Sequence, residues 1–336
     1  MSIAQELIAV HPVRKSGRQK RAFIGYVQNL CRQHGWSCAI ETGGIAPKSR
    51  NIVIGDLETA QIVVTAHYDT CAALPLPNFI TPRNPLCFLL YQLLLCAALF
   101  IPPIALAALL GRWLNQPMVT AFLCPLFTLL VCVQMICGFA NPHTANDNTS
   151  GTAVVLELMA SLPENSRANA ALVLFDNEEL GLFGSAFFHR KHRRQMANKL
   201  LVNLDCVSDG THWMLCAKKA ARQNPRYAIL AQAFEKSAQA AGKTPVYCAA
   251  AWTVYPSDQM QFRQGVAVCA LKKAPLIGLY MDRIHTPFDT VYDPVHLNGL
   301  KDCLLQAICS IEQQAARCKN EPAFRPNAPL PVSTPE

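Results

Sequence analysis

The pattern of hydrophobic and polar positions divides the chain into alternating predicted strands and helices, interrupted by one long apolar stretch. Residues 1–35 read as a basic helical region, and a closing helix is predicted over 294–316. The other expected strands are 51–54, 61–66, 170–175, 200–204, 266–271 and 276–280, and the other expected helices are 150–162, 180–199 and 225–241. Short apolar strands separated by helices are typical of an α/β fold with a mostly parallel or mixed sheet and helices on both faces.

The long apolar stretch covers residues 84–140, where Arg112 is the only formally charged residue. Its two segments, 86–110 and 117–140, contain 25 and 24 uncharged residues. At about 1.5 Å of rise per residue, each is long enough for a hydrocarbon layer of roughly 30 Å. Neither segment has the polar stripe of a helix packed on a soluble protein. We therefore expect an inserted transmembrane hairpin of two helices, with a buried hairpin or a hydrophobic lid as the alternative.

The insertion sets the expected domain boundaries. Residues 1–83 and 141–318 are predicted to form one discontinuous domain, and the proline-rich residues 319–336 a disordered tail. Because Lys and Arg are concentrated outside the hairpin, the positive-inside rule places this domain in the cytoplasm. The N-terminal region has no uninterrupted apolar core of signal-peptide length, so no signal peptide is expected.

The amino-acid composition excludes some classes of protein. Only 15% of the residues are charged and 51% are apolar, which excludes disorder for most of the chain. Lys and Arg exceed Asp and Glu by 30 − 22 = 8 residues, but no motif that reads DNA or RNA accompanies the excess, so no nucleic-acid partner is expected. Basic clusters at 14–21 and 190–194 are either solvated helix faces or contacts to anionic lipid. The 15 cysteines include no C-x-x-C pair, which favours reduced, buried thiols.

Histidines and carboxylates recur directly after predicted strands or at a helix start. They are His67 in VVTAHYDT, Asp147 in NPHTANDNTSG, Glu178 and Glu179 in LVLFDNEELG, Asp205 in LVNLDCVSDG, and His285 in RIHTPFDT. In an open α/β sheet, functional groups gather at the carboxyl ends of strands, so these side chains are expected to share one crevice. Four ionised carboxylates close together need cations, because like charges raise one another's pKa values. Imidazole mixed with carboxylate suits zinc or a similar divalent ion.

The order of these motifs resembles metallopeptidase family 28, which contains dizinc aminopeptidases, glutamate carboxypeptidases and glutaminyl cyclases. The resemblance covers residues 8–83 and 141–316. Its motifs are H-x-D at His67, D-N-x-S-G at Asp147, the tandem Glu, N-x-D at Asp205, S-D-x-x-x-F at 257–262 and H-T-P-x-D-T at His285. The resemblance implies an α/β fold of the zinc-aminopeptidase type, similar to the phosphorylase/hydrolase fold.

The resemblance also implies a set of metal ligands for two Zn²⁺ ions, or for other divalent ions in the same places. Asp147 would bridge the two ions. His67 and Asp205 would complete one site, and Glu179 and His285 the other. A helix cap is the ordinary role for an aspartate at position 147, and that role is compatible with bridging.

Further residues are expected to support the chemistry. Glu178 would be the general base, which takes a proton from a metal-bridged water and passes it to the leaving amine. Asp69, two residues after His67 on the same strand face, is expected to orient that imidazole, with a plain turn carboxylate as the alternative. Asp289 is a weaker candidate for similar support, and Tyr255 is a candidate for stabilising the oxyanion.

One feature departs from the family pattern. In the family a short loop joins the first histidine to the bridging aspartate, whereas His67 and Asp147 are 80 positions apart here. The apolar insertion accounts for most of this excess. The metal ligands and the hairpin are therefore expected to be close neighbours in space.

Together with the apolar insertion, the resemblance implies a membrane-anchored zinc metallopeptidase, a hydrolase that removes N-terminal residues from peptides. Its expected partners are a peptide substrate and membrane lipid, and no oligomeric state follows from the pattern. One alternative is a glutaminyl-cyclase-like acyltransferase with a single zinc ion, against which the retention of His67 beside Asp205 argues. The other is a catalytically silent membrane receptor or scaffold on the same fold, against which the complete set of ligands argues.

Overall fold

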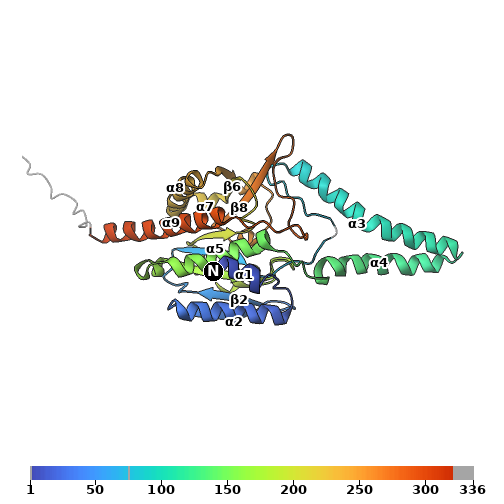
Figure 1. The fold of residues 1–336 in the computed structure, drawn as a ribbon, viewed down its shortest axis with the longest axis horizontal. Coiled ribbons are helices and arrows are strands. Elements are labelled where there is room, and N and C mark those ends of the chain that lie inside the picture. Colours follow the sequence, from blue (N-terminus) through green and yellow to red (C-terminus); the bar gives the residue numbers. More distant parts are fainter. Residues whose placement is uncertain (1, 75, 321–336) are drawn as a thin grey trace, which may run out of the picture.

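A nine-stranded mixed sheet lies at the centre of the protein. The computed structural model describes residues 2–74 and 76–320 (Figure 1). The strands are β1 (Cys38–Gly43), β2 (Ser49–Ile54), β3 (Ile62–His67), β4 (Ala170–Phe175), β5 (Leu200–Leu204), β6 (His212–Ala217), β7 (Thr244–Ala249), β8 (Gly265–Ala274) and β9 (Gly278–Tyr280). Their order is β1-β2-β4-β3-β5-β8-β6-β7, with β9 paired to β8.

The middle of the sheet is parallel, antiparallel pairs flank it on both sides, and the edge strand β7 is added parallel to β6. β4, β3, β5 and β8 are parallel neighbours, whereas β1–β2, β2–β4, β6–β8 and β8–β9 are antiparallel pairs. Every residue of β3, β4 and β5 is buried, as expected for strands covered on both faces. The predicted mixed α/β fold is confirmed, and the carboxyl ends of β3, β4 and β5 all meet at one edge of the sheet.

Helices cover both faces of the sheet. They are α1 (Ile3–Val10), α2 (Gly17–Gln33), α5 (Gly151–Ser161), α6 (Phe183–Lys191), α7 (Lys219–Arg222), α8 (Pro225–Ala240) and α9 (Pro294–Asn320). Along β3, Val64 packs in a core with α1, α2, α5, α8 and α9, and its neighbour Val63 packs on the opposite face with Phe188 of α6. This alternation follows from the two-residue period of a strand. We call the sheet with these helices the α/β body.

Several elements differ from the sequence-based expectation. The first 35 residues form two helices, because the chain is extended through Pro12 and Ser16 caps α2 with a capping box to Gln19. The expected helix over 180–199 is helical only over Phe183–Lys191. Strands β1, β6 and β7 were not expected. α9 continues to Asn320, and the rest of the expected tail lies outside the described residues.

The apolar insertion folds as two helices, α3 (Pro85–Trp113) and α4 (Pro117–Cys137), which project from the α/β body (Figure 1). At about 1.5 Å per residue, their lengths are about 43 Å and 32 Å, so both are long enough and apolar enough to cross a membrane. Near the tip, a Cβ on Gly111 would lie 1.9 Å from Thr120 Oγ1, so only glycine permits this approach of the helices.

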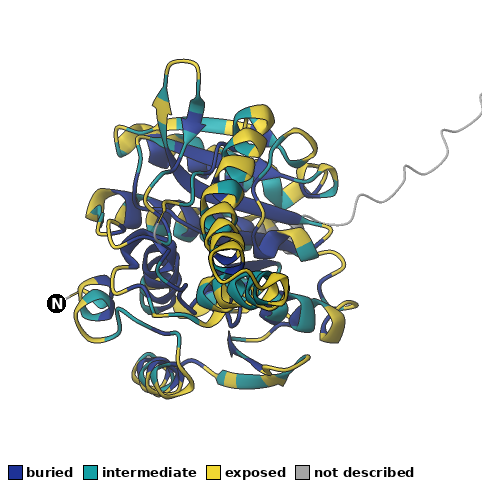
Figure 2. Ribbon diagram, turned by 90° about the vertical axis from the view of Figure 1, so that its right-hand side faces the viewer, coloured by how far each residue is buried: buried dark blue, intermediate teal, exposed yellow. Residues whose placement is uncertain are grey.

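The hairpin is exposed in this structure. In the most apolar stretch of α3, only 11% of the residues are buried. In the corresponding stretch of α4, no residue is buried. In Figure 2, the hairpin points toward the viewer and is mostly exposed or intermediate, whereas the strands behind it are buried. This exposure contradicts the alternative of a hairpin buried inside the chain's own core.

Candidate metal centre

Six side chains meet at the carboxyl edge of the parallel strands. They come from the ends of β3, β4 and β5, from the segment before α5 and from the loop after β9: His67, Glu178, Glu179, Asp205, Asp147 and His285. All six line one cavity of about 120 Å³. The structure therefore brings together every residue that the sequence nominates as a metal ligand or as the general base.

Asp147 lies at the centre of this group, in the irregular segment Ala145–Ser150 (η1) that leads into α5. Its carboxylate is buried, and its two oxygens face different histidines. Oδ1 lies 3.3 Å from Nε2 of His67, and Oδ2 lies 3.1 Å from Nε2 of His285. A carboxylate placed in this way can serve two cations at once.

Each histidine has a second acidic neighbour. Nε2 of His67 lies 3.6 Å from Oδ1 of Asp205, and Nε2 of His285 lies 3.3 Å from Oε2 of Glu179. Two ligand atoms bound to one tetrahedral zinc ion at 2.0–2.1 Å are about 3.3 Å apart. The observed spacings therefore fit two metal positions that share Asp147.

A buried oxygen of Glu179 gives an independent reason to expect a cation. Oε1 of Glu179 is inaccessible to solvent and has no hydrogen-bond partner among the described residues. A buried carboxylate oxygen without a partner is costly unless a cation or a proton satisfies it. Because the same carboxylate faces His285, a divalent ion at this position would remove the cost.

The pKa shifts of the site residues also indicate that the buried carboxylates need positive charge beside them. Burial raises the pKa of Glu179 to about 8, although His285 works against the shift. Burial likewise raises the pKa of Glu178 well above its ordinary value, with His67 opposing. For His285, burial disfavours the charged form, but Glu179 and Asp147 outweigh it and raise the pKa to about 9. The carboxylates of this site thus depend on neighbouring positive charge to remain ionised.

Asp69 supports the site differently from the expectation. Its carboxylate lies 3.7 Å from Nδ1 of His67, beyond hydrogen-bond distance, and the imidazole instead contacts the backbone oxygen of Asp69 at 3.1 Å. The carboxylate accepts the backbone N–H groups of Glu178 at 3.1 Å and of Glu179 at 3.2 Å. Asp69 therefore positions the tandem glutamates through their backbone, and its carbonyl group positions His67.

Asp289 repeats this arrangement on the other side of the site. Its two carboxylate oxygens accept the backbone N–H groups of Asn146 and Asp147, both at 2.9 Å. Burial raises the pKa of Asp289 to about 7, and the negative charge of Asp147 adds to the shift. The segment that carries the central aspartate is thus held by a second buried carboxyl group.

Three positions at the site, Cys206 with a φ of 53° among them, have backbone angles that residues with side chains rarely adopt. Asn177, just before the tandem glutamates, has a φ of 57°, and His285 has a φ of 63°. The N–H of Leu74 donates to the backbone oxygen of His285 at 2.8 Å, which ties this residue to the loop that follows β3. Such strained positions persist only where the surrounding structure fixes them, and they cluster at functional sites.

Residues of the S-D-x-x-x-F and neighbouring segments have structural roles. The hydroxyl of Tyr255 donates to the backbone oxygen of Asp205 at 3.0 Å, so its proton is engaged and the expected oxyanion role is not supported. Ser257 accepts from the amide of Asn203 at 2.9 Å. Asp258 is fully buried with both carboxylate oxygens unpartnered among the described residues, and burial raises its pKa to about 7.

Two residues of the basic cluster at 14–21 do not face a membrane surface. Arg14 is fully buried, and its guanidinium donates to the backbone oxygen of Tyr68 and to Thr149 Oγ1. Lys20 is buried against Asp176, with Nζ 2.5 Å from Oδ1. The expectation that these cations contact lipid is therefore wrong for both. Arg14 instead braces the strand end beside His67, which charge patterning alone could not indicate.

Cysteine was not expected near the ligands, but Cys71 lies there. Its Sγ and one ligand atom from each of Glu179 and His285 lie within 4.8 Å of one another. Burial raises the pKa of the Cys71 thiol well above its ordinary value, and the negative charges of Glu179 and Asp147 add to the shift. The fourteen cysteines whose side chains the structure describes are all free.

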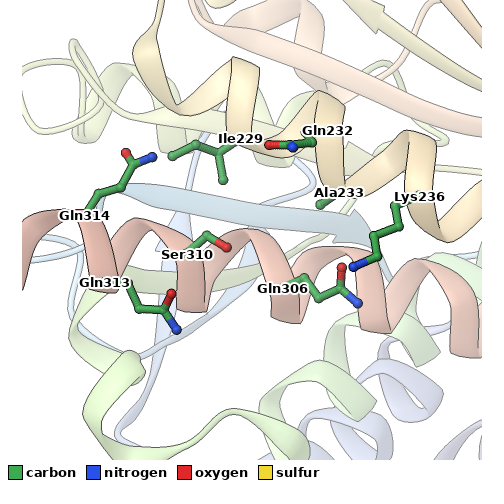
Figure 3. Close-up of a pocket in the computed structure, with 8 residues that line it drawn as sticks. All are labelled: Ile229, Gln232, Ala233, Lys236, Gln306, Ser310, Gln313 and Gln314. Atoms are coloured by element: carbon green, nitrogen blue, oxygen red, sulfur yellow. The ribbon is translucent and has the colours of Figure 1, made fainter.

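A separate cavity of about 340 Å³ lies between α8 and α9 (Figure 3). Lys236 and four glutamines line it, and no His, Cys, Asp or Glu is found among its described lining residues. It therefore lacks the side chains that usually bind metal ions, and Lys236 is the only titratable group among its described lining residues. The cavity at the carboxyl edge of the sheet is the candidate site.

Comparison with protein families agrees with this geometry. The model of peptidase family M28 matches residues 133–308, which include five of the six site residues. The resemblance drawn from the motifs is thereby confirmed. Among curated proteins, no significant match was found.

Solved structures share the fold at low sequence identity. Porphyromonas gingivalis glutaminyl cyclase is 14% identical, with a TM-score of 0.58 over 92% of this chain and 96% of that chain. A Zn-dependent exopeptidase of Parabacteroides distasonis is 12% identical, with a TM-score of 0.58 over 91% and 94%. The Legionella pneumophila aminopeptidase LapA is 13% identical, with a TM-score of 0.53 over 92% and 70%. These similarities show the fold of zinc exopeptidases and glutaminyl cyclases.

Proposed function

Because the chain belongs to peptidase family M28, we propose that it is a dizinc aminopeptidase that its apolar hairpin anchors in a membrane. Family membership supports a peptidase-type enzyme. The observation that carries the finer proposal is the position of Asp147, whose two oxygens face two separate pairs of ligands, His67 with Asp205 and His285 with Glu179.

The residues of the site have different roles in the proposed hydrolysis. Two divalent ions at these positions would polarise the scissile carbonyl and lower the pKa of a water molecule. Glu178 is the general base: its carboxylate takes the proton of the attacking water and transfers it to the leaving amine. Asp69 and Asp289 hold the backbone of Glu178 and Asp147, so the base and the central ligand are fixed before substrate arrives.

The shape of the site cavity supports action at the chain end. Its volume is about 120 Å³, and its apolar walls come from Ile80, Met281 and Ile284. A cavity of this size suits one side chain rather than an extended peptide. We therefore propose that it holds the N-terminal residue, and that apolar side chains are preferred there.

Several exposed apolar residues support attachment to a bilayer at the base of the hairpin. Phe139 follows α4 directly and is 85% exposed. Leu276 is fully exposed, and its backbone oxygen contacts the Asn84 amide, which caps α3. Trp252 is 86% exposed on the segment whose Val254 donates to the backbone oxygen of Pro82. Side chains of this kind favour the interface between headgroups and hydrocarbon. With the charge pattern, they support a cytoplasmic α/β body.

The test combines metal analysis with product analysis of the full-length protein in anionic liposomes. We expect two zinc ions per chain and release of free N-terminal amino acids from short peptides. Release of ammonia from peptides with N-terminal glutamine, without loss of a residue, would instead identify a glutaminyl cyclase. If the zinc-loaded protein showed neither reaction, it would be a silent receptor or scaffold.

A further inference from the structure

A second cavity lies between the end of the hairpin and the candidate active site. Its volume is about 440 Å³. Three parts of the chain line it: the end of α4 and the residues after it, the start of α2, and the segments that hold the metal ligands. Glu179 lines both this cavity and the smaller cavity over the proposed metal positions. The two cavities are therefore neighbours, with Glu179 between them.

The wall that α4 contributes is fixed to the α/β body. Nζ of Lys15 donates to the backbone oxygen of Ile136 at 2.7 Å, in the last turn of α4. Beyond α4, Ala140 forms an antiparallel bridge with Ala72 in the loop after β3. Because that loop also contains Asp69, the end of the hairpin and the support of the tandem glutamates are parts of one connected unit.

The lining changes in character from one end of the cavity to the other. Near the metal ligands it is formed by Asp69 and Glu179, and near the hairpin by Ile136 and Cys137. The wall at the start of α2 is polar and is formed by Lys15, Ser16, Gln19 and Lys20. Ile136 is half exposed, so an apolar group that enters from this side gains contact with an apolar wall. This end lies at the root of the helices that we propose to be membrane-embedded (Figure 1).

We propose that this cavity binds the residues that follow the scissile bond, and that the substrates are apolar peptides that reach it along the bilayer surface. The inference rests on the proposed aminopeptidase function and adds the substrate class. The small cavity takes the N-terminal side chain, Glu179 stands between the two cavities, and the peptide continues toward α4. Polar peptides lose the contact with Ile136 and do not concentrate at the membrane.

The experiment fills the cavity and compares substrates of different length. Cys137 lines the cavity, is exposed and ends α4, so Cys137→Trp introduces bulk there with little effect on the core. Cys96→Trp is the matched control, because Cys96 is an exposed cysteine in the middle of α3 and outside the cavity lining. The substrates are a Leu-Gly dipeptide and two hexapeptides that begin with Leu-Gly and continue with leucines or with serines.

In liposomes, wild-type protein should prefer the apolar to the polar hexapeptide by about tenfold in kcat/KM, which corresponds to the burial of about two methylene groups. Cys137→Trp should remove most of this preference, mainly through KM, and should leave cleavage of the dipeptide within about twofold. Cys96→Trp should change neither value.

Two results would overturn the inference and can be told apart from failure of the proposed function. If Cys137→Trp lowers dipeptide and hexapeptide cleavage equally, or lowers neither, the cavity does not bind the peptide beyond the scissile bond. If wild-type protein cleaves both hexapeptides equally well, the substrate class is wrong. If it does not cleave the dipeptide at all, the proposed aminopeptidase function itself fails.

Discussion

Strand β3 and helix α4 are both rich in apolar residues, yet one is wholly buried and the other has no buried residue. β3 has neighbouring strands on both sides and helices over both faces, so its apolar side chains find partners within the chain. α4 has only α3 beside it along most of its length. Both segments are apolar, and the topology decides whether other parts of the chain cover them, as they do for β3 and do not for α4.

The α/β body, which contains β3, and the hairpin, which contains α4, have different roles in the proposed function. The α/β body carries every candidate ligand and the general base, and the hairpin carries none of them. The body should therefore determine the chemistry, and the hairpin should determine where it takes place and on which peptides. Substitutions in the body should abolish turnover, whereas changes in the hairpin should alter location and selectivity.

The largest effect is expected from Asp147→Ala in the body. Because this carboxylate faces both pairs of ligands, its loss should weaken both metal positions together. We expect zinc content to fall well below two ions per chain and peptide cleavage to fall to background. Metal analysis after gel filtration checks this, with the exposed Asp302→Ala as control. Two tightly bound zinc ions in the variant would contradict a bridging role.

Glu178→Gln should separate chemistry from metal binding. The amide keeps the shape of the side chain but cannot accept the proton, so kcat should fall by about two to four orders of magnitude. Zinc content and the melting temperature should stay at wild-type values, because Glu178 is not among the proposed ligands. Exposed Glu164 provides the control substitution, Glu164→Gln. Turnover near that of wild type would exclude Glu178 as the base.

Asp69→Asn should have an intermediate effect. An amide offers one acceptor oxygen in place of two, so one of the N–H groups of Glu178 and Glu179 loses its partner. We expect kcat/KM to fall by about 10- to 100-fold, as for other residues that orient ligands indirectly. Asp289→Asn should behave similarly, through Asn146 and Asp147. An unchanged kcat/KM in both variants would show that the backbone hydrogen bonds accepted by Asp69 and Asp289 do not matter for catalysis.

The smallest effect on dipeptide cleavage is expected from removal of the hairpin. Replacement of residues 85–137 by a short glycine–serine linker should leave kcat/KM for a dipeptide within about threefold, because no residue of α3 or α4 lines the small cavity. The shortened protein should no longer sediment with membranes or need detergent. Circular dichroism checks that the body is folded. Membrane association without the hairpin would mean that other surfaces anchor the protein.

The sequence predicted the site better than it predicted the supports of the site. His67, Asp147 and His285, which the structure brings together in the candidate site, could be nominated because their side chains are potential metal ligands and their motifs occur in a recognisable order. The actual role of Asp69 depends on backbone N–H groups more than 100 positions away, which no side-chain pattern reveals. Arg14 was misjudged because arginine is rarely buried, and only its acceptors explain why it is buried here.

The elements of the fold also differ in how well the sequence predicted them. The central strands were predicted because buried parallel strands form uninterrupted apolar runs. β7 was missed because it carries Pro245, which an edge strand tolerates, and because its side chains are mostly partly exposed. The two apolar helices were predicted from their length and lack of charge. Their exposure in the structure required the coordinates, because a buried core helix has the same composition.

The bridge between Ala72 and Ala140 has a consequence for how such a protein could arise. It joins the two ends of the inserted segment and, with the bond from Asn141 N–H to the Cys71 oxygen, closes them into a stem. Loop closure costs only about 0.6 kcal/mol more for each doubling of length. A stem of this kind can therefore accept a short turn or a long hairpin at similar cost. For the proposed membrane-anchored enzyme, we therefore expect that exchanging the hairpin would change its location and its larger cavity, but not the segments that carry the candidate metal ligands.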